Sequence, residues 1–342
     1  MSGIAISSRV TIHDVARHAG VSHQTVSRVM NEHPSVAPGT RKKVLAAVEA
    51  LHYQPNSAAR SLVTQRSHTL GIVGFGLPYY GPAQMMVNIE QAARSRGYSV
   101  SLASIPALRE AEIERALLDL RRQNVEGIIL IAPLEGANTQ RIRKLCDDVP
   151  FVLVDAPELN SNSGATIDQK TGACVAAQHL ISLGHERIAL LSGPQRWYDA
   201  RLRLDGWTEA LNGAGLAPVS ILEGDWSAVS GFGLTQELLA ARIPFTGLLV
   251  GNDQMALGAL WALHEREISV PDDVSIVGYD DIPESRFFHP PLTTVRQDFA
   301  TLGALSLAAL LRAVESPNSH ANPQVLKPEL VIRRSTAVAA RI

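Results

Sequence analysis

The sequence predicts an α/β protein with a small, all-helical N-terminal head and a larger body of two lobes, each built on a doubly wound parallel sheet. Apolar residues repeat at helical spacing throughout residues 10–53. From Thr69 onward, short and continuously apolar runs alternate with amphipathic stretches, which is typical of parallel sheets made of βαβ units. About 270 residues of this pattern exceed what one sheet holds, so we expect two lobes.

The head is predicted to contain three helices. Apolar residues repeat at helical spacing from Ile12, and Thr11 is placed to cap this first helix. A break at Gly20 precedes a second helix from about His23 to Asn31, and a third helix runs from about Gly39 to Leu51. Two short helices joined by a glycine-containing turn form the arrangement of a helix-turn-helix unit.

The second helix of such a unit enters the major groove of DNA and presents polar residues to base edges. Glutamine and arginine can make bidentate hydrogen bonds to adenine and guanine, and hydroxyl side chains suit phosphate contacts. The residues expected at this interface are Ser22, His23, Gln24, Thr25, Ser27 and Arg28. Taken alone, this segment is also compatible with a helical bundle that exposes one polar helix.

Charge is distributed unevenly along the chain. Residues 1–66 carry eight Lys and Arg against three acids, a net +5, so the remaining 276 residues sum to −7 although the whole chain carries only −2. A basic head on an acidic body favours a polyanionic partner for the head. Residues 54–68, which follow the head, are small and polar and are expected to form a linker.

Strands and helices are expected to alternate along the body, because buried parallel strands are continuously apolar and the helices covering them need one apolar face. The predicted strands are Leu70–Gly74, Val100–Ala103, Gly127–Ile131, Phe151–Val154, Ile188–Leu191, Leu248–Val250 and Ser275–Gly278. The predicted helices are Ala83–Arg96, Glu110–Gln123, Gly172–Leu183, Leu204–Ala214, Gly231–Ala241 and Gln254–Arg266.

Composition excludes membrane and secreted classes of protein. Hydrophobic residues make up 46% of the chain, yet no run of about 18 apolar residues predicts a membrane span. The first residues lack the charged and apolar regions of a signal peptide. The two cysteines, Cys146 and Cys174, have no CxxC spacing, which suits a reducing compartment. We therefore expect a cytoplasmic protein with no membrane partner.

Enzyme signatures are missing from the sequence. The Gly74-Phe75-Gly76 run after the first strand is followed by Tyr79 where a dinucleotide fingerprint requires its third glycine. There is no GxxxxGK[ST] loop, GxSxG elbow or HExxH spacing. We expect no catalytic residues, no metal and no cofactor. An exported sugar-binding protein would share a two-lobed body, but the head and the absent signal peptide argue against it.

The run TIHDVARHAGVSHQTVSRVMN, from Thr11 to Asn31, resembles the head of the LacI/GalR repressor family nearly residue for residue. The likeness continues through Thr40–Val44, Tyr53–Asn56, Ala200–Leu204, Glu223–Ala228, Asn252–Gly258, Val277–Asp281 and Pro290–Phe299, and covers about residues 10–337. It implies a helix-turn-helix head over 1–54, a hinge helix or linker over 55–68, and a periplasmic-binding-protein-like core over 69–342. Lobe 1 would hold about 69–166 and 297–325, and lobe 2 about 167–296 and 326–337.

The resemblance extends the expected DNA interface beyond the recognition helix. It adds Thr11 and Asn31 in the head, and Asn56, Ala59 and Leu62 in the hinge. In relatives the hinge helix enters the minor groove, and a leucine at the position of Leu62 wedges between bases and kinks the duplex. Without the resemblance, residues 55–68 are an inert tether with one exposed leucine.

An effector site between the lobes is implied in the same way. Polar side chains would hydrogen-bond sugar hydroxyls, and aromatic rings would cover the apolar face of the sugar. The residues implied at this site are Phe75, Asp155, Arg203, Trp226, Asn252, Asp280, Gln297 and Phe299. Considered singly, Trp226 fits a core position and Asp280 a solvated turn better than a ligand site, and only the motifs taken together favour the effector site.

The implied function is sequence-specific repression of a sugar-utilisation operon by a homodimer on double-stranded, pseudo-palindromic operator DNA, relieved by a small galactoside-like sugar. The chain ends at Ile342 without the leucine heptad helix that joins two dimers in a member of this family, so a dimer is expected. The Gly74–Tyr80 segment is bulkier than in that member. We therefore expect a ligand of different size or linkage. The alternative effector is another sugar or a purine, including one that acts as a co-repressor.

Overall fold

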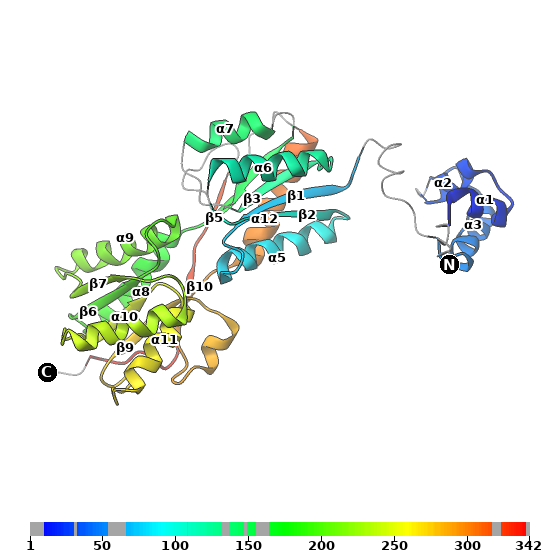
Figure 1. Ribbon diagram of the computed structural model, residues 1–342. Helices are drawn as coiled ribbons and strands as arrows, with labels where there is room; N and C mark the ends of the chain where they lie inside the picture. Colours follow the sequence, from blue (N-terminus) through cyan, green and yellow to red (C-terminus); the bar gives the residue numbers. More distant parts are fainter. Residues whose placement is uncertain are drawn as a thin grey trace, which may run out of the picture. The chain divides into compact units, whose positions relative to one another are not determined.

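The computed structural model describes residues 10–30, 33–53, 66–107, 109–131, 137–146, 149–154, 164–316 and 323–339. The chain divides into two units, Met1–Ser67 and His68–Ile342. The first unit is helical and the second is a two-lobed α/β body, so the predicted fold class is confirmed (Figure 1).

Three helices form the head: α1 (Ile12–Ala19), α2 (His23–Met30) and α3 (Pro38–Ala50). Thr11 caps α1 through a reciprocal capping box with Asp14, as the sequence predicts. Gly20 ends α1 with a φ of 65°, which turns the chain toward α2. The three helices are held together by a small apolar core of Val15, Ala16, Val26, Val29, Val44 and Ala47.

The first lobe is built on a parallel four-stranded sheet in the order β2-β1-β3-β4. Its strands are β1 (Thr69–Phe75), β2 (Ser99–Ile105), β3 (Gly127–Ile131) and β4 (Phe151–Val154). On one face lie α5 (Tyr80–Ser95) and α12 (Phe299–Glu315), and on the other lie α6 (Glu110–Arg122) and α7 (Ala137–Cys146) (Figure 1). Apolar residues fill both interfaces, which matches the continuously apolar strands of the sequence.

The second lobe contains a six-stranded sheet in the order β12-β10-β9-β8-β6-β7. Its strands are β6 (Ile188–Ser192), β7 (Ser220–Glu223), β8 (Gly247–Val250), β9 (Ser275–Asp280), β10 (Thr293–Arg296) and β12 (Glu329–Val331). One face packs against α8 (Gln169–Ser182) and α9 (Tyr198–Gly213), and the other against α10 (Ala228–Ala240) and α11 (Asp253–His264). The edge strand β12 runs antiparallel to β10, so this sheet is not purely parallel.

Three described segments carry the chain between the lobes. The first passes from β5 (Ala165–Ile167) into α8, the second from β10 into α12, and the third from β11 (Gln324–Leu326) into β12. Strands β5 and β11 pair with each other beside the core of the first lobe. Within the described ranges, every helix is too short or too polar to cross a bilayer.

Candidate functional site

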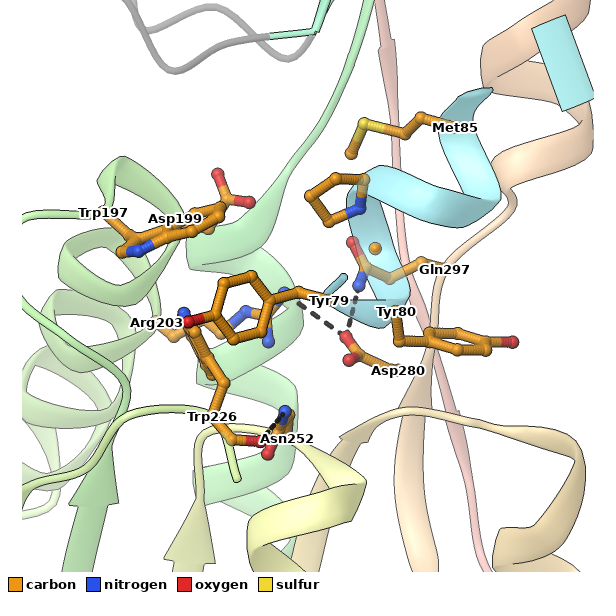
Figure 2. A pocket seen from close by; sticks show the side chains of 12 residues that line it. Tyr79, Tyr80, Met85, Trp197, Asp199, Arg203, Trp226, Asn252, Asp280 and Gln297 are labelled. Atoms are coloured by element: carbon orange, nitrogen blue, oxygen red, sulfur yellow. Dashed lines mark hydrogen bonds and ion pairs between the residues drawn. The ribbon is translucent and has the colours of Figure 1, made fainter. Parts of the chain in front are cut away.

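A pocket with an empty volume of about 380 Å³ lies between the two lobes. The second lobe contributes residues at the carboxyl ends of its strands: Asp280 is the last residue of β9, and Asn252 lies two residues after β8. The first lobe contributes the start of α5. The lining residues are Tyr79, Tyr80, Gly81, Pro82, Met85, Trp197, Asp199, Arg203, Trp226, Asn252, Asp280 and Gln297 (Figure 2). This edge is where open α/β sheets bind ligands.

Five residues of the implied effector site meet in this pocket: Arg203, Trp226, Asn252, Asp280 and Gln297. Two others do not line it. Phe75 stacks on Trp197 with ring centroids 4.9 Å apart, and Phe299 meets Tyr80 edge-on at 6.1 Å. Both phenylalanines therefore contact residues that line the pocket, and their implied contact with the effector stays a prediction. Asp155 lies outside the described residues.

Aromatic residues that the sequence reasoning did not assign to the site close the pocket. Trp197 is only 5% exposed, and it contacts Tyr79 at 5.3 Å and Trp226 at 6.2 Å, edge-on in both cases. Because Tyr79 belongs to the first lobe and Trp197 to the second, this contact crosses between the lobes (Figure 2). The bulky side chains of the Gly74–Tyr80 segment gave some indication that Tyr79 lies at the site. Trp197 and Asp199 precede the predicted helix, and no sequence pattern indicated them.

Arg203 is held at the floor of the pocket by several acceptors at once. Its Nη1 donates to the carbonyl of Gly251 at 2.6 Å, and its Nη2 lies 3.4 Å from Oδ1 of Asp280. The guanidinium carbon lies 3.8 Å from the ring centroid of Tyr279, a cation–π distance. Both charged side chains are 6% exposed, so each compensates the buried charge of the other.

The surroundings of Asp280 change the pKa of its carboxyl group, which lies in the pocket lining. Burial raises the pKa of Asp280 to about 6, and the Arg203 guanidinium and a hydrogen bond from Gln297 at 2.6 Å oppose that rise. Neighbouring Asp253 is fully buried and accepts hydrogen bonds from Thr294 and the amide of Ile282. Its pKa is raised well above the usual range by burial and by the nearby charge of Asp280.

A hydrogen bond from the side chain of Asn252 to the backbone of Trp226 connects these two lining residues. Asn252 caps α11 by accepting from the amide of Met255 at 2.9 Å, and its Nδ2 donates to the carbonyl of Trp226 at 3.0 Å. The indole of Trp226 lies directly against Gly193, where an added Cβ would stand 2.1 Å from Cη2 of the ring. The orientation of the indole therefore depends on glycine at position 193.

Replacing Gly193 with alanine is expected to destabilise the body by about 1–3 kcal/mol, because the new methyl must displace a tryptophan that is 7% exposed. Urea denaturation followed by tryptophan fluorescence measures this loss. Gly213→Ala is the matched control, since nothing lies within 4 Å of a Cβ there. Equal stability of the two variants would contradict the packing argument.

The head presents its polar residues on the side away from its core. Ser22, His23, Gln24 and Arg28 are exposed, while Val26 and Val29 of the same helix are buried. The ring of His23 lies 5.1 Å from that of His13 on α1, a contact that sequence reasoning missed. Two predicted contacts also serve local structure, because Thr11 caps α1 and the hydroxyl of Ser22 accepts from the amide of Thr25 at 3.1 Å.

Four of the predicted DNA contacts lie outside the described residues: Asn31, Asn56, Ala59 and Leu62. Arg41, which was not predicted, donates to the carbonyl of His33 at 2.9 Å and so ties α3 to the chain that follows α2. Among the described side chains, no three His, Cys, Asp or Glu residues gather in a way that could hold a metal ion.

Comparison with known proteins covers both units. Residues 11–56 match the family described as bacterial regulatory proteins, lacI family, and residues 177–336 match a periplasmic binding protein-like domain. The lactose operon repressor of Escherichia coli K12 is 38% identical over 327 residues, which are 96% of this chain and 91% of that protein. The ribose operon repressor of the same strain is 35% identical, with 95% of this chain and 99% of that protein covered.

A solved structure extends the likeness to the fold. The lac repressor dimer bound to operator and the anti-inducer ONPF has a TM-score of 0.88 and 38% identity, covering 96% of this chain and all of that one.

Proposed function

The chain belongs to the lacI family of bacterial regulatory proteins, and from that premise we propose that it represses a sugar-utilisation operon and leaves its operator when a small galactoside-like sugar binds. The head would read a pseudo-palindromic, double-stranded operator. The body would bind the sugar between its lobes.

The chemistry of the pocket is the observation that carries this proposal. Arg203, Asn252, Asp280 and Gln297 supply fixed donors and acceptors, and Trp226 supplies an aromatic face beside them. Sugar hydroxyls need such directional partners, while the C–H face of the ring needs an apolar surface.

A second candidate keeps the DNA-binding function and changes the effector. The aromatic rings of Tyr79, Trp197 and Trp226 would also cover a planar purine, and the 35% identity to a ribose operon repressor favours consideration of other sugars. Such a ligand would act either as an inducer or as a co-repressor. Arg203, Asn252 and Asp280 supply donors and acceptors that suit a ligand with several hydroxyl groups, which favours a sugar.

Regulation follows from linkage between the two sites. Sugar would weaken operator binding by no more than the ratio of its affinities for the two lobe arrangements, one of which binds DNA weakly. Operator would weaken sugar binding by the same factor. We place the protein in the bacterial cytoplasm, on its operator DNA, as a regulator without catalytic activity, metal or cofactor.

Operator affinity tests the proposal. The protein is titrated onto a fluorescent lac-operator-like pseudo-palindrome at fixed salt, with and without a panel of galactosides, glucosides and purines. Release by galactosides alone supports the proposed effector class. Tight binding relieved by a glucoside or purine moves the effector to the second candidate, and no specific DNA binding overturns the function itself.

Sugar affinity is expected to fall as the pH is lowered through about 6. Burial raises the pKa of Asp280 to about 6, and a sugar hydroxyl donates a stronger hydrogen bond to the ionised carboxylate than to the neutral acid. Affinity should therefore be full above that pH and decline by up to about tenfold per pH unit below it. Calorimetric titrations from pH 5 to 8 measure this, and a flat profile would contradict the role given to Asp280.

Homodimerisation is proposed through an apolar face of the second lobe. Val229 on α10 is 81% exposed, and Leu257 and Trp261 on α11 are 44% and 56% exposed. α10 and α11 cross closely, since a Cβ on Gly258 would lie 1.9 Å from the carbonyl of Ala228. These side chains therefore form one patch, and exposed apolar patches mark association surfaces.

Trp261→Glu is expected to convert the dimer to a monomer and to weaken operator binding by about 100-fold, because two linked heads bind two half-sites jointly. Light scattering gives the mass, and anisotropy gives the operator affinity. Ile221→Glu, on edge strand β7 at 47% exposure, is the control expected to remain dimeric. A dimeric Trp261→Glu protein would rule out this face.

A further inference from the structure

A closed ring of side chains connects the floor of the pocket to two of the segments that cross between the lobes. Nε of Arg203 donates to Oε1 of Gln169 at 3.0 Å, and Nε2 of Gln169 donates to Oε1 of Gln297 at 2.8 Å. Nε2 of Gln297 donates to Oδ1 of Asp280 at 2.6 Å, and this oxygen lies 3.4 Å from Nη2 of Arg203. The ring joins residues up to 128 positions apart in the sequence.

The direction of every hydrogen bond in the ring is fixed by its charged ends. Arginine can only donate, so the atom of Gln169 facing it must be the carbonyl oxygen, which leaves the amide nitrogen facing Gln297. The same logic orients Gln297, whose nitrogen must face the carboxylate of Asp280. No member can flip without leaving a buried donor facing a donor, or an acceptor facing an acceptor.

Gln169 occupies a special place in this ring. It is 1% exposed and is the first residue of α8, immediately after the crossing from β5. Gln297 follows β10 at the start of the second crossing, into α12. The backbone carbonyl of Gln169 also accepts from the hydroxyl of Tyr279 at 3.2 Å, and Tyr279 stacks on Arg203. Relative movement of two lobes is absorbed by the segments that connect them.

We propose that Gln169 is a positioning residue that couples the effector pocket to the lobe crossings: it holds Arg203 for the ligand and transmits any change at Arg203 or Asp280 to Gln297. The inference rests on the proposed function. A ligand that engages Arg203 or Asp280 alters one bond of a ring whose members cannot reorient independently. Its effect therefore reaches both crossings, and occupancy biases one arrangement of the lobes over the other.

Gln169→Glu tests the link selectively. The glutamate still accepts from Arg203 but cannot donate to Gln297, so the ring opens at one bond. Methyl β-galactoside is titrated calorimetrically into the full-length protein, free and bound to operator duplex. The ratio of the two dissociation constants is the coupling factor. We expect this ratio to fall about threefold or more in the variant, within the range that single residues modulate coupling.

Gln178→Glu on the exposed face of the same helix is the matched control and should keep the wild-type ratio. A purely structural role for Gln169 would weaken binding of the galactoside equally with and without operator. An unchanged ratio in Gln169→Glu would therefore overturn the proposal, even if both affinities drop.

A second measurement separates failure of this inference from failure of the proposed function. If methyl β-galactoside does not bind the wild-type protein, the proposed effector class is wrong, and the ring is then judged by urea unfolding of Gln169→Leu, Gln297→Leu and the double variant. If Gln169 and Gln297 belong to one ring, the unfolding equilibrium constant of the double variant should differ by more than about threefold from the value expected by adding the two single effects. Additive effects would overturn the ring, and with it the coupling role of Gln169.

Discussion

Arg203→Ala is expected to lower sugar affinity by at least about 100-fold and to leave operator affinity within about twofold of the wild-type value, so that the repressor no longer responds to its effector. Arg203 is the pocket's only arginine among the lining residues. Its guanidinium is fixed by Gly251, Gln169 and Asp280, so its remaining N–H groups are preorganised for a ligand. The head lies in a separate unit and keeps its own core.

Stability must be separated from ligand binding in this variant. Removing Arg203 leaves the carboxylate of Asp280 buried and without its ion-pair partner, which costs about 3–5 kcal/mol in comparable buried pairs. The double variant Arg203→Met with Asp280→Asn removes both charges and should recover most of that stability without recovering sugar binding. Arg201→Ala on the same helix should bind sugar normally. A wild-type dose response from Arg203→Ala would contradict the assignment of the pocket.

Periodicity was sufficient to predict the parts of the fold that are set locally. Predicted strands Gly127–Ile131 and Phe151–Val154 have the same bounds as β3 and β4, because continuous apolar character marks a parallel strand buried on both faces. Asn252 follows β8 and Asp280 ends β9, and the carboxyl ends of these neighbouring parallel strands meet at one sheet edge. This is why Asn252 and Asp280 meet in the pocket as the resemblance implied.

The sequence did not predict helix starts that lack a side-chain cap, or a helix that packs against residues far away in the chain. α9 begins at Tyr198 instead of Leu204, and its N-cap, Trp197, makes no capping hydrogen bond, so nothing in the sequence marked the start. Trp197 and Asp199 were missed for that reason. α12 was not predicted, and it returns to the first lobe to pack against α5, more than 200 positions away in the sequence. Such long-range pairings leave no periodic trace.

The buried amides show a different limit. Gln169 begins a helix and carries no motif, and its importance arises only when Arg203 and Gln297 are brought to it across 34 and 128 positions. Phe75 and Phe299 show the reverse case, because the resemblance placed them at the pocket and the structure places each against a lining residue. Whether a ring lines a pocket or supports the lining depends on its neighbours, here Trp197 and Tyr80.

Arg28→Ala is expected to lower operator affinity by about tenfold or more and to leave sugar affinity unchanged, the reverse of Arg203→Ala. Arg28 is exposed in the last turn of α2, four residues from Gln24, so the two side chains project from one face of the helix opposite buried Val26 and Val29. Arginine can bind guanine through two hydrogen bonds, and each such contact discriminates by about 1–3 kcal/mol. Fluorescence anisotropy with operator and with unrelated duplex measures the loss.

The comparison between the two duplexes decides what Arg28 contacts. If Arg28 reads a base, Arg28→Ala loses affinity for the operator far more than for unrelated DNA. If it contacts phosphate, both affinities fall together and the salt dependence decreases by about one ion. Arg94→Ala removes the same charge from the body, where Arg94 is 79% exposed and pairs with Glu90, and should change neither affinity. Undiminished operator binding by Arg28→Ala would exclude Arg28 from operator recognition, and Gln24→Ala would then test the same exposed face of α2.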